Sequence, residues 1–178
     1  MRIREHLYFA PGVKFADVDI DGRTLADQVA HRVRSFYLQP ACALVDAGHA
    51  FASGVMIVVA IDALARLQTG RADVGGRFRD WCTANLPSCD AAISRRFYEA
   101  FRNGLVHEAR IKDGCEFSLE ARETFVKIGD ILSCNPALLL GEVEAALDAY
   151  VRTLEANAAE LESLRCRIRQ DFGYELSN

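Results

Sequence analysis

The chain has 178 residues, of which 51% are hydrophobic and 26% charged, a composition typical of a globular protein with a sizeable core. The formal net charge of −4 excludes a global basic field, so a nucleic acid would have to be bound by a local basic patch. The longest apolar run, residues 50–61, is too short for a membrane span of about 20 residues, and the charged N-terminus does not resemble a secretory signal. We therefore expect a cytoplasmic protein without membrane association.

The cysteines show no metal-binding pattern. They form no C-x-x-C pair, and no histidine lies at metal-ligand spacing from any of them. We expect free, buried thiols in a reducing compartment, and neither a metal ion nor another cofactor. Cys115 and Cys134 flank a predicted hairpin, but a disulfide between them is not expected. The six positions are Cys42, Cys82, Cys89, Cys115, Cys134 and Cys166.

The first elements are an extended segment and a helix. Residues 1–22 mix short apolar stretches with turn signals, and we expect irregular or weakly extended structure there. Thr24 can cap a helix that runs to about Leu38. Its apolar residues recur at helical spacing, at Leu25, Val29, Val33 and Phe36.

A second helical pattern begins at Pro40, which suits the first turn of a helix, and continues to about Gln68 with a break at Gly48. Residues 50–67 are apolar nearly all round, which predicts a buried central helix. Asp62 lies inside this helix. A carboxylate paired with an arginine, or turned to the edge of the bundle, is favoured over a catalytic role.

Two connections frame the middle of the chain. Residues 69–76 are rich in glycine but lack the spacing of a phosphate loop, so we interpret them as a connection. A short helix over 77–86 follows. Ser88 or Asp90 can then cap a helix over about 91–110.

After a turn at 112–114, the chain is predicted to form a β-hairpin over 115–132. The apolar positions favour strands at 115–120 and 124–132, joined by a bend at 121–123.

Residues 136–171 are predicted to form one long helix, capped by Asn135. Its apolar residues alternate at spacings of three and four, which is a heptad pattern, and Asn157 occupies one position of this seam. The part beyond Leu154 either meets a second copy or another helix, or the whole helix is one wall of the bundle. The sequence leaves both interpretations open.

These elements predict a mainly α-helical bundle with a small β-hairpin inserted before a long C-terminal helix. No repeat or linker divides the chain, so we expect a single domain over residues 1–178.

The helix over 91–110 carries the chemically suggestive segment. On a straight α-helix, one polar stripe contains Arg96, Glu99, Asn103, His107 and Arg110. The opposing row is apolar and should face the core, with Ile93, Phe97, Phe101 and Leu105. Arg102 and His107 are five residues apart, or about 140° around the axis, and do not share a face. A loosened backbone at or near Gly104 would let Arg102 reach the stripe.

A cluster of arginine, asparagine and histidine suits phosphate chemistry. Histidine transfers protons near neutral pH, arginine binds phosphoryl oxygens and developing negative charge, and asparagine positions a phosphate or the imidazole ring. Further basic residues nearby would bind an RNA backbone, and Glu99 would support the site. These basic residues are Arg95, Arg96, Arg110 and Lys112. The competing interpretation is that this stripe is a solvated helix face.

The string Arg102-Asn103-x-x-x-His107 resembles the R-x4–6-H motif of HEPN domains, in which the residue after the arginine is often asparagine. The flanking residues, from Phe97 to Arg110, resemble those of small bacterial HEPN-like proteins. Some toxin members of the family carry a tyrosine two residues after the histidine, where this chain has Ala109.

The resemblance implies a metal-independent endoribonuclease that acts as a homodimer, with the motifs of both chains meeting in one cleft. It implies that Arg102 binds the scissile phosphate, His107 transfers protons and Asn103 positions the phosphate. A role as a toxin or in phage defence, with an antitoxin or other protein partner, follows from the same resemblance.

Two other functions stay open from the sequence. The chain could be a catalytically silent helical module that dimerises or binds a partner through its C-terminal seam. It could also be a HEPN-like module that binds a nucleotide or is itself modified by a partner enzyme.

Overall fold

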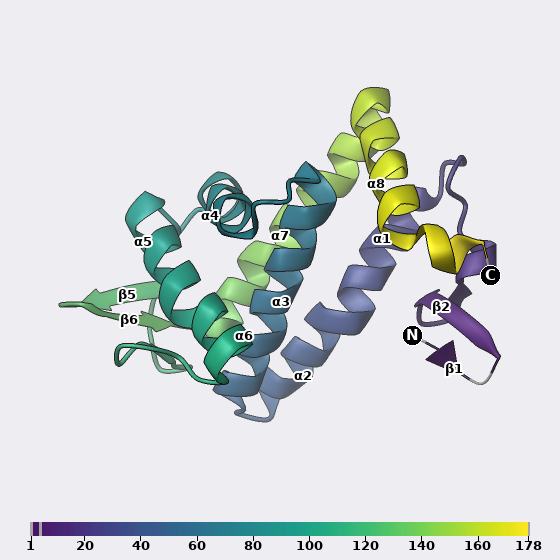
Figure 1. Ribbon diagram of the computed structural model, residues 1–178. Coiled ribbons are helices and arrows are strands. Elements are labelled where there is room, and N and C mark those ends of the chain that lie inside the picture. Colours follow the sequence, from purple (N-terminus) through teal and green to yellow (C-terminus); the bar gives the residue numbers. More distant parts are fainter. Residues whose placement is uncertain (1, 4, 178) are drawn as a thin grey trace. The chain divides into compact units, whose positions relative to one another are not determined.

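The computed structural model describes residues 2, 3 and 5–177, and it is mainly helical, as the sequence predicts (Figure 1). Contacts between residues divide the chain into two compact units. One comprises Met1–Phe36 and Leu147–Asn178, and the other comprises Tyr37–Ala146. The expected single domain therefore stays a prediction, and each unit is described by itself.

The unit of residues 37–146 is built around α3 (Ala50–Thr69), which packs between α2 (Gln39–Asp46) and α4 (Val74–Asn85). The predicted break at Gly48 is confirmed, with Gly48 at φ 76° between α2 and α3. The helix α4 begins earlier than predicted, because Asp73 caps it by accepting a hydrogen bond from Gly76 N–H at 3.1 Å.

The interior of α3 is apolar, which allows this helix to lie at the centre of the unit. Ile57, Ile61 and Leu64 are fully buried. Among the described residues, α3 is the one helix with the length and composition to cross a membrane, and half of its most apolar window is buried. The core helix of a soluble protein has these same properties.

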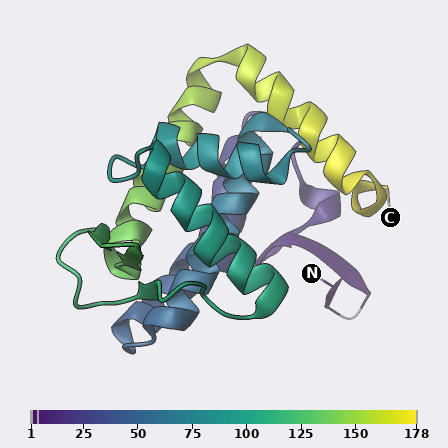
Figure 2. The same ribbon diagram turned by 60° about the vertical axis from the view of Figure 1, so that its left-hand side comes forward.

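The next helical stretch runs without interruption through α5 (Ala91–Arg96), the π-helical turn η3 (Phe97–Arg102) and α6 (Asn103–Glu108), as Figure 2 shows. Its apolar side packs on aromatic neighbours. The ring of Phe97 lies 5.7 Å from that of Phe78, and the ring of Phe101 lies 4.9 Å from that of Phe117. The predicted core positions Phe97 and Phe101 are therefore confirmed.

A small sheet follows, with strand order β4 (Glu116–Phe117), β6 (Ile131–Cys134) and β5 (Phe125–Ile128). The hairpin predicted over 115–132 was misplaced, because the hairpin is β5–β6 and β4 pairs with β6 in parallel. Its two-residue turn begins at Gly129, whose φ of 61° suits the first central position of a type II′ turn. The predicted strand over 124–132 ran across Gly129-Asp130, a dipeptide typical of such a turn, and so missed it.

The other unit contains a second small antiparallel sheet, of order β1 (Arg2–Ile3), β2 (His6–Ala10) and β3 (Val13–Lys14). These short strands are consistent with the irregular or weakly extended structure expected over residues 1–22, although their pairing into a sheet was not predicted. A short 3-10 turn, η1 (Phe15–Asp17), follows. The rings of Phe9, Phe15 and Phe172 cluster, and Arg32 lies over those of Phe9 and Phe172.

The first long helix was predicted to end near Leu38. Instead α1 (Leu25–Val33) continues through the π-helical turn η2 (Arg34–Leu38) directly into α2. Thr24 precedes α1, but its hydroxyl donates to Asp19 Oδ2 at 2.9 Å and caps no helical N–H.

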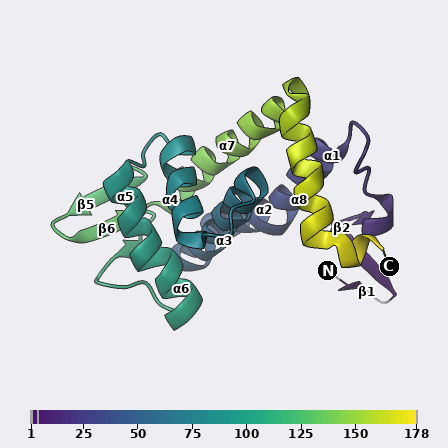
Figure 3. The ribbon, with the colours of Figure 1, turned by 45° about the horizontal axis from the view of Figure 1, so that its top comes forward.

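The predicted long helix over 136–171 is two helices, α7 (Pro136–Ala156) and α8 (Ala158–Leu176), and the chain turns between them (Figure 3). Asn157 has extended backbone angles, φ −127° and ψ 102°, and its side chain accepts hydrogen bonds from Ala159 and Glu160 N–H. Asn157 is therefore the N-cap of α8. The continuous heptad seam was a wrong prediction, because an asparagine fits both a polar seam position and a helix cap.

Candidate active site

The segment Arg102–His107 begins at the last residue of a π-helical turn. Asp90 begins the helical stretch by accepting a hydrogen bond of 2.7 Å from Ile93 N–H, as one of the two predicted caps. In η3 the backbone N–H of Asn103 donates to the carbonyl of Tyr98, five residues earlier. Turns of this kind occur often at functional sites. The loosened backbone expected at or near Gly104 thus lies over residues 97–102 and includes Arg102.

The chain after α6 folds back onto the motif. Ala109 ends α6 with φ 54°, and Lys112 N–H then donates to the carbonyl of Ala100 at 3.0 Å. This return brings the backbone against Gly104, where an added Cβ would lie 2.3 Å from the carbonyl oxygen of Arg110. Gly104 is therefore required by the close approach of two backbone segments.

Arg102 is held by a carboxylate on α3. Its Nη2 and Nε donate to Oδ2 of Asp62 at 2.7 and 3.2 Å, and Nη2 of Arg77 donates to Oδ1 at 3.2 Å. The side chains are largely buried, with exposed fractions of 13% for Arg102, 11% for Arg77 and 21% for Asp62. The predicted pairing of Asp62 with an arginine is confirmed. One carboxylate facing two guanidinium groups leaves a net positive charge at the motif.

Asn103 lies beside Arg102, whose Nη1 donates to Asn103 Oδ1 at 3.4 Å. His107 is on the same helix, α6, four residues after Asn103, so the two side chains share a face. His107 is exposed and makes no hydrogen bond or ion pair to any residue that the structure describes. The motif therefore combines an anchored guanidinium, an adjacent amide and a solvent-accessible imidazole.

Three of the predicted phosphate-binding residues contact carboxylates instead. Arg96 donates to Asp113 at 2.9 Å and to the carbonyl of Asp130 at 3.0 Å, away from the motif. Arg110 and Lys112 both pair with Glu108, and these two cations, Lys112 first, lower the pKa of the Glu108 carboxyl. The polar stripe predicted from Arg96 to Arg110 assumed a straight α-helix. It is not formed as predicted, because the π-helical turn η3 interrupts the α-helical spacing.

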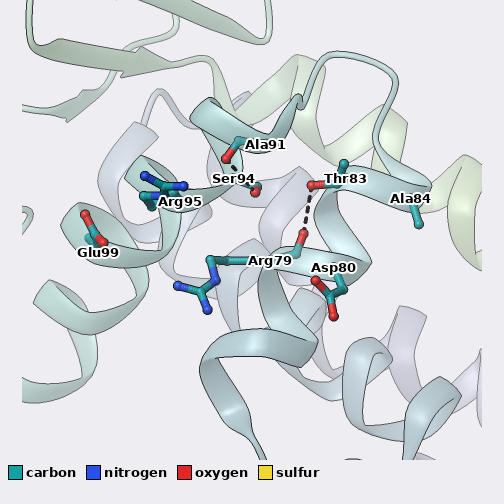
Figure 4. Close-up of a pocket in the computed structure, with 8 residues that line it drawn as sticks. All are labelled: Arg79, Asp80, Thr83, Ala84, Ala91, Ser94, Arg95 and Glu99. Carbon is teal, nitrogen blue, oxygen red and sulfur yellow. Dashed lines mark hydrogen bonds between the residues drawn. The ribbon is translucent and has the colours of Figure 1, made fainter.

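Arg95 and Glu99 line a cleft between α4 and the helical stretch that begins with α5 (Figure 4). Its volume is about 830 Å³, and residues of α4 form the opposite wall. Sequence reasoning placed Arg95 and Glu99 with the motif but gave no indication of this cleft, because the facing residues come from another helix.

Tyr98 connects the cleft to the motif and was missed by sequence reasoning. Its ring centroid lies 5.6 Å from the guanidinium carbon of Arg79 and 5.9 Å from that of Arg102. Arg77 was missed as well. The only signal for Tyr98 in the sequence was its position four residues before Arg102.

The cysteines are free, but two of them are not buried as expected. Cys42 and Cys166 are exposed, whereas Cys82, Cys89, Cys115 and Cys134 are buried. Burial, followed by a hydrogen bond with Cys89, raises the pKa of the Cys82 thiol well above its usual value, and burial does the same for Cys134. Among the described residues, no group of three or more histidine, cysteine or acidic side chains could hold a metal ion.

Comparison with known proteins finds no matching family model, no matching curated protein and no matching solved structure.

Proposed function

We propose that this protein is a HEPN-like endoribonuclease that acts as a homodimer without a metal ion, through Arg102, Asn103 and His107. The observation that carries this proposal is the joint placement of Arg102 and Asn103, linked side chain to side chain, one turn before an exposed imidazole on the same helix. The resemblance of this string to the R-x4–6-H motif supports the same function.

The anchoring of Arg102 suits a phosphate-binding role. Nε and Nη2 are engaged by Asp62, which fixes the guanidinium plane, while Nη1 is directed toward Asn103. A fixed guanidinium binds phosphoryl oxygens without first losing side-chain freedom and stabilises the charge that builds up in the transition state. Arg77 shares the Asp62 carboxylate, so this carboxylate does not cancel the positive charge needed for a phosphate.

The reaction would use the 2′-hydroxyl of the RNA as nucleophile. His107 takes its proton as the oxygen attacks the adjacent phosphorus, and the bond from phosphorus to the 5′-oxygen breaks. A second histidine protonates that 5′-oxygen, which leaves a 2′,3′-cyclic phosphate and a 5′-hydroxyl. A single imidazole cannot hold and lack its proton at once, so the partner's His107 is proposed as the acid. An exposed His107 without an internal partner fits this arrangement.

The biological setting that we infer is that of a toxin or defence protein in the cytoplasm, where an RNA-cleaving enzyme needs control by an antitoxin or another protein. The motif resemblance supports this setting.

The test is cleavage of single-stranded RNA in the presence of EDTA. We expect His107→Ala to lower the rate by about 10²–10⁴-fold, the usual contribution of a general acid or base. His49→Ala is the matched control, because His49 is exposed and lies outside the motif. Products should carry a 2′,3′-cyclic phosphate, and a 2′-deoxy residue at the cleavage point should block the reaction. Equal rates for the wild-type chain and His107→Ala would refute the proposal.

The dimer is tested by mixing. If two histidines from two chains form one site, an excess of His107→Ala chains should reduce the activity of each wild-type chain, because mixed dimers are inactive. Activity that stays proportional to the amount of wild-type chain would contradict the shared site.

A further inference from the structure

We propose that the cleft between α4 and α5, called here the α4–α5 cleft, binds the phosphate backbone of a single RNA strand through Arg79 and Arg95. This inference rests on the proposed nuclease function for its ligand. It adds a subsite for phosphates that are not cleaved, and it assigns a role to Arg79, a residue that the motif does not include.

The charges in the α4–α5 cleft favour an anionic ligand. Neither Arg79 nor Arg95 makes an ion pair with any residue that the structure describes. Asp80 also lines the cleft, but it is paired with Arg71 at 2.5 Å. Glu99 is the remaining carboxylate, so the two arginines leave an excess of positive charge.

The hydrogen-bond donors of the cleft point to the same class of ligand. The hydroxyl of Thr83 donates to the carbonyl of Arg79 at 3.0 Å, and that of Ser94 donates to the carbonyl of Ala91 at 3.3 Å (Figure 4). Both hydroxyl protons are therefore committed, and the two guanidinium groups supply the remaining side-chain donors. A ligand rich in acceptors, such as a phosphodiester, matches them. The hydroxyl oxygens and Glu99 can accept hydrogen bonds from ribose hydroxyls.

Arg79 is oriented before any ligand binds. Its guanidinium carbon lies 5.6 Å from the ring centroid of Tyr98, so an aromatic face holds the side chain and leaves its N–H groups for a ligand. In Figure 4 the Arg79 side chain extends from α4 toward the helix that carries Arg95 and Glu99.

Tyr98 also sets the distance from the cleft to the motif. Its ring centroid lies 5.9 Å from the guanidinium carbon of Arg102, so Arg79 and Arg102 are no farther apart than these two distances combined. A stacked strand advances about 3.4 Å per nucleotide, so a strand of a few nucleotides can contact both arginines. The volume of about 830 Å³ accommodates part of such a strand.

The experiment measures binding in a chain that does not cleave. A fluorescein-labelled oligouridine is titrated with full-length His107→Ala and with the same chain carrying Arg79→Gln and Arg95→Gln, at several salt concentrations. We expect the added pair to weaken binding about tenfold or more and to reduce the salt slope by about 0.7 for each phosphate that is no longer neutralised. The control pair, Arg122→Gln with Arg152→Gln, removes two exposed arginines outside the cleft and should change neither quantity.

The outcomes distinguish an RNA strand from a free nucleotide as the ligand of the cleft, and they test the cleft separately from the nuclease function. Unchanged affinity and slope after Arg79→Gln and Arg95→Gln, or an equal loss in the control pair, would overturn the assignment. If AMP competes with the oligouridine and its own binding also depends on Arg79 and Arg95, the ligand is a free nucleotide. The proposal that the cleft binds an RNA strand would then be overturned. If the wild-type chain cleaves RNA, Arg79→Gln with Arg95→Gln should raise KM while kcat is unchanged. If the wild-type chain does not cleave RNA, the nuclease proposal fails. The binding titration still shows whether Arg79 and Arg95 bind an RNA strand.

Discussion

Nη2 of Arg102 donates a hydrogen bond of 2.7 Å to Oδ2 of Asp62, a residue forty positions earlier on the central helix α3. This contact ties the motif to the core of its unit, and it explains an ionisable residue inside an apolar helix. In the proposed reaction, Asp62 would position Arg102 by accepting hydrogen bonds from its Nε and Nη2.

Replacing Asp62 by asparagine should destabilise the protein by about 1–3 kcal/mol, because two largely buried guanidinium groups lose their charged partner. Urea denaturation measures this change. Asp80→Asn breaks an exposed ion pair with Arg71 and should cost less than about 1 kcal/mol. A double-mutant cycle of Asp62→Asn with Arg102→Gln should show a coupling energy above about 0.5 kcal/mol. Additive effects would mean that the contact contributes nothing.

Gly104→Ala should destabilise the protein, whereas Gly141→Ala should stabilise it. The new Cβ at position 104 meets a backbone carbonyl at 2.3 Å, and moving that segment costs about 1–3 kcal/mol. Position 141 in α7 has no atom within 4 Å of the added Cβ, so alanine gains about 0.5–1 kcal/mol of helix propensity there. Thermal unfolding of the two variants should therefore shift in opposite directions. A stabilised Gly104→Ala protein would disprove the close approach.

Asn157→Ala should lower the free energy of unfolding by about 0.5–2 kcal/mol, because two N–H groups at the start of α8 lose their acceptor. Asn157→Gly should cost only a few tenths of a kcal/mol, since glycine is tolerated at a helix cap. Denaturation experiments compare the two variants. If Asn157→Ala is neutral for stability but changes the oligomeric state, the asparagine acts in a seam and not as a cap.

Stability should fall at alkaline pH because of buried thiols. Burial raises the folded-state pKa of Cys134 above that of the unfolded chain, so this contribution is complete below the ordinary thiol pKa of about 8.5 and is lost as the pH rises further. Each such thiol contributes a slope of up to about 1.4 kcal/mol per pH unit.

Unfolding free energies measured between about pH 7 and about pH 10, on both sides of the ordinary thiol pKa, test this dependence. Cys134→Ala should flatten the alkaline slope, although it lowers stability at neutral pH by removing buried volume. Cys166→Ala, at an exposed thiol, should leave the slope unchanged. An identical slope in all three proteins would rule out the buried thiol as its source.

The sequence predicted those features that depend on nearby residues or on burial. The break at Gly48, the cap at Asp90 and the buried faces of Phe97 and Phe101 follow from local patterns, and the structure confirms them. The sequence predicted that Asp62 would pair with an arginine, because a carboxylate on a buried apolar helix needs a cationic partner. Which arginine it would be depended on tertiary packing.

For other features, the spacing of residues in the sequence was compatible with two different structures. Phe97 and Phe101 are four apart, a spacing that suits an α-helix, so nothing local indicated the π turn between them. Asn157 fits a seam as well as a cap, and Gly129 lay between apolar residues that together suit one longer strand. The α4–α5 cleft could not be predicted, because its two arginines come from separate helices and meet only in the folded unit.

The π turn before Arg102 also bears on how related sequences should be compared. Removing one of the residues 97–101 from η3 would return the segment to an ordinary α-helix and would leave the string from Arg102 to His107 unaltered. Because each α-helical residue turns by about 100°, Asn103 and His107 would then rotate by about that angle relative to α5. Two chains with identical motif letters can therefore present them on different sides of the same helix. The length of the segment before the arginine is part of the signature.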